Sequence, residues 1–163
     1  MKNIIYFIIA IALTALAYTS FIKDPSAPLI SASPALNDTN TFDALSSEAA
    51  EGAEVFIIEP LNGTRTTSPV TIKFGVRNMT IAKAGDPTEF SGHHHLLINL
   101  DELPALNKPL PATEQIIHFG GAQTETTIAL ASGQHSLQLL LGNYLHIPHN
   151  TPVLSEKISI IIE

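Results

Sequence analysis

The chain of 163 residues contains no cysteine and no tryptophan. Without cysteine, disulfide bonds, thiolate metal ligands and cysteine nucleophiles are all excluded. Basic residues are also scarce, with eight Lys and Arg against 15 Asp and Glu and a net charge of −7. These few cations do not cluster, so the electrostatic footprint of nucleic-acid binding is missing and nucleic acid is excluded as a partner. The length and the hydrophobic fraction of 45% allow one modest domain with a short tail.

The first residues have the layout of a secretory signal. Lys2 precedes an apolar run from Ile4 to Ala17, and the run ends in the small-x-small cleavage pattern Ala15-Leu16-Ala17. Because a bilayer span needs about 20 apolar residues, a cleaved signal peptide over residues 1–22 is favoured over an uncleaved N-terminal anchor. We therefore expect an exported protein, periplasmic or extracellular, tethered to a membrane only if this segment stays uncleaved. Residues 23–52, rich in Ser, Pro, Ala, Asn and Asp, are predicted to form a flexible linker.

Residues 53–163 are predicted to form an all-β domain. In the clearest strand, Val70, Ile72 and Phe74 alternate with polar residues, which is the pattern of a half-buried strand. The predicted strands cover residues 55–58, 70–76, 96–100, 116–119, 124–130, 134–141 and 153–162. Asn62-Gly63 and Ser132-Gly133 have the composition of hairpin turns. About seven short strands without a βαβ rhythm favour an immunoglobulin-like Greek-key β-sandwich.

Seven histidines lie between residues 93 and 149, and the first 92 residues contain none. Strand alternation places His93 and His95 on one face and His94 on the other. On its face, His94 is equally well interpreted as a buried, hydrogen-bonded core residue. His146 and His149 lie in one short proline-containing loop, where both imidazoles can clamp a ligand from the same side.

Two further histidines and one methionine complete the candidate set. His118 ends a short strand next to two glycines that allow a corner, and His135 shares the phase of the leucines in its strand, so it points toward the core or its rim. Neutral imidazole binds copper, zinc or nickel, and the thioether of Met79 favours copper. The predicted metal ligands are His93, His95, His146, His149, His94, His118, His135 and Met79. The carboxylates that could orient these rings are Asp86, Glu89, Asp101 and Glu125.

The sequence offers little for catalysis. No serine stands in a GxSxG context, and neither GxxxxGK[ST] nor GxGxxG occurs, so serine hydrolases and nucleotide-binding enzymes have no support. A metal hydrolase or oxidase would need an open coordination position and a shaped cavity as well as ligands. No catalytic residue is predicted, and a non-enzymatic function is favoured.

Several blocks occur in a specific order along the chain. They are SGHHHLLI at 91–98, HFGGAQTE at 118–125, GQHSLQLLLG at 133–142 and HIPHNTPV at 146–153, preceded by IEPLNG at 58–63. Together they resemble the bacterial domain-of-unknown-function family 4399, over about residues 54–162. All the predicted ligands fall within the family-like segments, although Asn78 stands where the family typically has glycine before the methionine. The resemblance implies a small exported β domain and supplies no reaction.

Two functions remain as hypotheses. In the first, an exported, non-enzymatic domain binds a transition metal, copper before zinc, and holds or delivers it outside the cytoplasm, with a periplasmic protein as a further candidate partner. Its affinity is expected to fall below about pH 6, where imidazole is protonated. In the second, the histidines are structural and the domain is an immunoglobulin-like envelope module that binds a protein or glycan. Convergence of at least three ring nitrogens on one point favours the first.

Overall fold

The computed structural model describes residues 42–163, so the predicted signal peptide and most of the predicted linker lie outside the described residues. Nine strands run through the described part of the chain. They are β1 (Glu54–Glu59), β2 (Arg65–Thr66), β3 (Val70–Arg77), β4 (Thr80–Ile81), β5 (Ser91–Ile98), β6 (Ile116–His118), β7 (Glu125–Ile128), β8 (Gly133–Gly142) and β9 (Ile158–Ile162). Over the same residues, no helix is long and apolar enough to cross a membrane.

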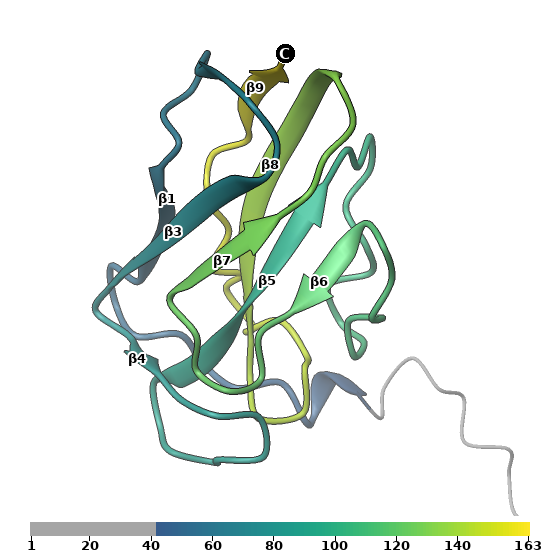
Figure 1. Cartoon of the computed structure of the whole chain (residues 1–163). Helices are drawn as coiled ribbons and strands as arrows, with labels where there is room; N and C mark the ends of the chain where they lie inside the picture. The colour runs from purple at the N-terminus through teal and green to yellow at the C-terminus, as the bar shows by residue number, and fades with distance from the viewer. Residues whose placement is uncertain (1–41) are drawn as a thin grey trace, which may run out of the picture. The chain divides into compact units, whose positions relative to one another are not determined.

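The strands form two sheets that pack face to face (Figure 1). The smaller sheet has the order β1-β3-β7 and is antiparallel. The larger sheet has the order β2-β9-β8-β5, and two short strands share the remaining side of β5. There, β4 runs parallel to the start of β5, and β6 runs antiparallel to its middle. The predicted all-β sandwich is confirmed.

The core between the sheets follows from the alternation in the sequence. Val70, Ile72 and Phe74 of β3 are buried from one side, and the leucines of β8 at 137, 139 and 141 meet them from the other. Burying one such side chain contributes about 2 kcal/mol to folding, which makes this core the main source of stability.

The central strand β5 is buried on both of its faces. Leu96 and Ile98 belong to the core between the sheets. Leu97 belongs to a second apolar cluster on the outer face, where Leu110, from the loop after β5, packs over it and Leu140. Because residues alternate along the strand, the histidines at the start of β5 are divided between the same two buried faces.

The strands differ most from the sequence prediction at three places. Nine strands replace about seven because β2 and β4, of two residues each, carry no detectable alternation. Strand β5 begins at Ser91 rather than residue 96, since the histidine triplet pairs with β8, and it ends before Asn99, whose φ is 53°. Strand β9 begins at Ile158 rather than residue 153, because ahead of it Leu154 makes an isolated bridge rather than a ladder.

The two predicted hairpin turns have the expected backbone conformation but a different connection. Gly63 and Gly133 adopt φ of 83° and 135°. However, the first turn joins β1 to β2 and the second joins β7 to β8, and in each case the two strands belong to different sheets. The hairpin prediction is wrong, because positive φ also suits a turn that carries the chain from one layer to the other.

Candidate metal centre

The histidine triplet lies in the first half of β5, where the strand pairs with the end of β8. His93 and His95 point to the outer face, and their ring centroids lie 4.9 Å apart. His94 points to the opposite face, where its ring packs 5.1 Å from that of Phe74 in the core. The strand thus delivers two imidazoles to one face, as its alternation predicts.

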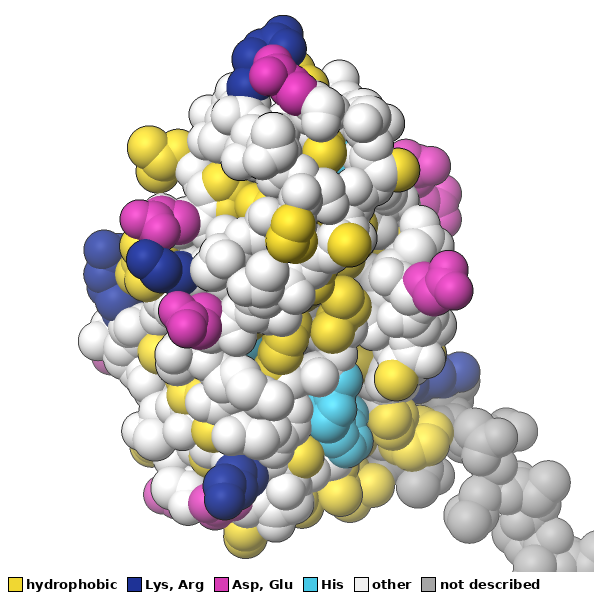
Figure 2. Space-filling view, in the orientation of Figure 1, with side chains coloured by type: hydrophobic (Ala, Val, Ile, Leu, Met, Phe, Trp, Pro, Cys, Tyr) yellow, Lys and Arg dark blue, Asp and Glu magenta, His cyan; other side chains and the backbone are white. Residues whose placement is uncertain are grey.

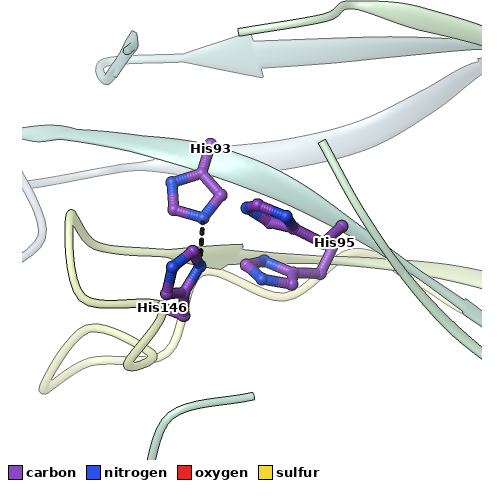
Figure 3. Close-up of side chains that lie close together, drawn as sticks. His93, His95 and His146 are labelled. Atoms are coloured by element: carbon purple, nitrogen blue, oxygen red, sulfur yellow. Dashed lines mark hydrogen bonds between the residues drawn. The ribbon is translucent and has the colours of Figure 1, made fainter. Parts of the chain in front are cut away.

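Two further imidazoles reach the same face from other elements. His118 ends β6 and is the direct cross-strand neighbour of His95. His146 comes from the loop between β8 and β9, and its Nδ1 lies 3.1 Å from Nε2 of His93 (Figure 3). At that distance one of these two nitrogens carries the proton and donates it to the other.

The four rings form a compact group, called here the four-histidine cluster: His93, His95, His118 and His146. Each ring offers one nitrogen such that all four nitrogens lie within 4.8 Å of one another. The ligands of a tetrahedral zinc ion, at about 2.0 Å from the metal, are about 3.3 Å apart. Side-chain shifts of about 1 Å would therefore bring the nitrogens to coordination distance. The cluster could hold a metal ion.

The cluster is buried on one side and reaches the surface on the other. His93 and His95 are 0% and 1% exposed, whereas His118 and His146 are partly exposed. Figure 2 shows histidine at the surface, with hydrophobic side chains around it. An ion could reach this face without the core opening.

Several buried nitrogens of the cluster have no hydrogen-bond partner among the described residues. They are Nδ1 of His93, both ring nitrogens of His95 and Nε2 of His118. A buried polar group without a partner costs about 1–3 kcal/mol. A metal ion bound at the single lone pair of a neutral ring would remove that cost for one nitrogen of that ring, so the donor set fits a borderline transition metal.

Burial favours the neutral form of three rings of the cluster, His93, His95 and His118. Burial lowers the pKa of His93 to about 4, and the neighbouring rings of His118 and His146 add to the shift. Burial lowers the pKa of His95 to about 3, with further contributions from His93 and His118. The pKa of His118 is also lowered, mainly by burial and then by His146. At neutral pH these rings offer free lone pairs for coordination.

Two glycines provide the space that the rings occupy. A Cβ on Gly120 would stand 2.6 Å from Nε2 of His118, and one on Gly142 would stand 2.7 Å from Cε1 of His95. Both distances are shorter than any real Cβ contact, so any other residue would displace the ring.

The remaining predicted histidines lie apart from the cluster. His149 is 1% exposed and its Nε2 donates to the carbonyl of Ser91, so the loop does not present it beside His146. His135, toward the other end of β8, has both nitrogens engaged: Nε2 donates to the Ala131 carbonyl, and Nδ1 accepts from the Asn99 amide. His94 is fully buried against the core, and neither of its nitrogens has a partner among the described residues.

Met79 and the acidic residues are placed differently from the prediction. The Met79 side chain packs against the main core, and its Sδ accepts a hydrogen bond of 3.4 Å from the Ala50 backbone N–H. The Asp86 carboxylate accepts hydrogen bonds from the backbone N–H and the hydroxyl of Thr88. Within residues 42–163, no carboxylate hydrogen-bonds to a histidine ring.

Sequence reasoning missed Asn143, which organises the loop that carries His146. Its Oδ1 accepts from the backbone N–H groups of Leu145 and Ile147. An asparagine directly after the last strand residue, Gly142, is a known start for such a side-chain-capped turn, and that position was the available signal.

A comparison with known protein families matches the part of the chain that holds the cluster. The profile of a family described as a domain of unknown function, DUF4399, matches residues 72–163. The chain belongs to this family. The matched part begins within β3, later than the resemblance in the sequence indicated, and contains the whole four-histidine cluster. No curated protein and no solved structure matches the chain.

Proposed function

We propose that this protein is an exported, non-enzymatic metal-binding protein that holds or delivers a transition metal outside the cytoplasm. The observation that carries the proposal is the four-histidine cluster, with its four ring nitrogens within 4.8 Å of one another. The signal-like residues 1–22 support export, since Lys2 and the apolar run that follows have the composition of a secretory signal.

The donor set narrows the class of metal. Four imidazoles without a thiolate or carboxylate suit Cu(II), Zn(II) or Ni(II) better than Ca²⁺ or Mg²⁺, which prefer oxygen. For such a set the Irving–Williams order places Cu(II) above Zn(II), so copper remains ahead of zinc in this proposal. The preference rests on nitrogen alone, because the Met79 sulfur is engaged with Ala50.

The test is calorimetric titration of the untagged full-length chain with Zn(II) and, separately, Cu(II). We expect one equivalent of metal per chain. His95→Ala or His118→Ala should lower the affinity at least about 100-fold, because losing only a residue that supports a ligand already costs about 10–100-fold. His135→Ala is the matched control, because that ring is bonded to Ala131 and Asn99 away from the cluster.

Equal affinities for His95→Ala, His118→Ala and His135→Ala would contradict the proposal, as would a wild-type chain that binds neither metal. A melting curve of each variant without metal shows whether it folds. Export is tested separately, by the mass and location of the mature chain in a host with a periplasm. We expect a periplasmic product cut after Ala17, and a full-length cytoplasmic product would refute export.

A further inference from the structure

His146 is the cluster member whose position depends most on its surroundings. It lies on a loop rather than a strand, and its φ of 66° places it in the left-handed region that non-glycine residues seldom adopt. Such a conformation persists only when neighbouring contacts hold it. The contacts that hold this loop therefore decide where the imidazole points.

Asn143 supplies the contacts inside the loop. Its side-chain Oδ1 accepts from the N–H of Leu145, at 2.9 Å, and from the N–H of Ile147, at 3.1 Å, the two residues that flank His146. Its backbone carbonyl accepts from the His146 N–H at 2.8 Å. Asn143 is 1% exposed, so water does not compete for these bonds.

The other end of the same amide ties the loop to the segment before β1. Nδ2 of Asn143 donates to the Leu45 carbonyl at 2.9 Å and to the Ser47 hydroxyl at 3.1 Å. The Ser46 hydroxyl donates to the carbonyl of Pro148 at 2.7 Å, and the Asn150 N–H donates to the carbonyl of Ser47 at 3.0 Å. Residues 45–47, which the sequence placed in the linker, are thus bonded to both sides of His146.

We propose that Asn143 is a positioning residue for the metal centre, and that residues 45–47, here called the strap, set metal affinity by holding the loop of His146 through it. This inference rests on the proposed function. In the strapped state His146 completes a set of four imidazoles. When the strap detaches, Asn143 loses its two strap bonds and the loop loses those at Pro148 and Asn150, so the loop holds His146 less firmly beside the other three imidazoles. The strap is therefore a means by which the chain before β1 can favour retention or release of the metal.

The experiment is a double-mutant cycle on Zn(II) affinity in the untagged full-length chain. Asn143→Ala removes the side-chain contacts inside the loop and the side-chain bonds to the strap, but keeps the backbone bond to His146. Ser46→Ala/Ser47→Ala removes the strap's side-chain bonds alone and is a milder change. Each is measured in the wild-type chain and in His146→Ala. Asn99→Ala is the matched control, since that amide holds the unrelated ring of His135.

We expect Asn143→Ala to weaken binding at least tenfold and Ser46→Ala/Ser47→Ala severalfold, with neither change having an effect once His146 is absent. Asn99→Ala is expected to leave the affinity unchanged. Equal losses in the wild-type and His146→Ala backgrounds would overturn the inference, because Asn143 would then act on the fold in general. Wild-type affinity in both strap and Asn143 variants would also overturn it while leaving the metal centre intact. A wild-type chain that binds no Zn(II) or Cu(II) would refute the proposed function and this inference together.

Discussion

The substitution Gly120→Ala tests the geometry of the cluster without replacing any of the four histidines. The added Cβ would stand 2.6 Å from Nε2 of His118. Since carbon and nitrogen atoms settle at about 3.5 Å or more, the ring must retreat by about 1 Å. Coordination bonds tolerate only about 0.2 Å, so the displaced ring would have to work against this clash to reach coordination distance. Gly120 has no left-handed φ, so alanine adds no backbone strain there.

We expect Gly120→Ala to lower the Zn(II) affinity at least about tenfold. This is the lower end of the loss of about 10–100-fold that follows when a residue orienting a metal ligand is changed. The stability of the metal-free chain should fall by no more than about 1–3 kcal/mol, the usual cost of one added methyl group in packed surroundings. The neighbouring Gly121→Ala is the control, because its Cβ would meet the flexible Gln123 side chain at 3.1 Å. Both quantities are measured by calorimetric titration and by denaturant unfolding. If Gly120→Ala binds metal as Gly121→Ala does, His118 is not a ligand at the position described.

Three further predictions follow from the buried rings and the sulfur. Burial lowers the pKa of His94 to about 4, so the metal-free chain becomes less stable as pH falls below 6.5, because the unfolded chain then binds more protons. Between pH 7.5 and 5 this ring alone lowers the free energy of unfolding by about 2 kcal/mol. His94→Leu should therefore lose about 2 kcal/mol less stability over this pH range in urea unfolding, and equal pH dependence in both chains would refute the assignment. Metal binding at pH 6 should release almost no protons from His93 and His95, whose pKa values are about 4 and 3. The total release, measured by titration in two buffers of different ionisation enthalpy, should therefore be at least about 1.5 protons below the roughly 3 protons of four ordinary imidazoles. A total of about 3 protons would contradict the burial of these two rings. Met79→Leu should keep the Cu(II) affinity within about threefold of wild type, because the Met79 sulfur accepts a hydrogen bond from Ala50 and the substitution conserves side-chain volume. A tenfold loss of affinity would show that Met79 is a ligand.

The sequence was sufficient for the features that depend on local periodicity. The alternation of Val70, Ile72 and Phe74 placed β3 correctly, and the same rule separated His94 from His93 and His95. Residue chemistry alone also indicated histidine as the residue type of a group that could hold a metal ion.

The other cluster members depend on pairing that no local pattern contains. His118 joins the cluster because the register of β6 on β5 sets it opposite His95, and His146 joins because Asn143 bends its loop. His149 has the same residue type and the same loop, yet it donates to the Ser91 carbonyl instead. Proximity in sequence grouped His146 with His149, whereas the fold separates them.

Two predictions relied on composition and missed the effect of packing. Met79 was interpreted as a soft ligand, but its side chain packs on the core and accepts from Ala50. Ser47, within the stretch interpreted as a linker, is bonded to Asn143 and Asn150. Small polar residues are typical of flexible segments, but the same hydroxyl and carbonyl groups suit a strap that bonds to an ordered loop.

X-ray absorption spectroscopy of the untagged chain loaded with one equivalent of Zn(II) tests the central claim most directly. The cluster of His93, His95, His118 and His146 predicts four imidazole nitrogens at about 2.0 Å from the ion, with the multiple-scattering signature of imidazole rings. In His118→Ala one nitrogen should be replaced by an oxygen from water. A first shell made mainly of oxygen, or one with fewer than three imidazoles in the wild-type chain, would contradict the account.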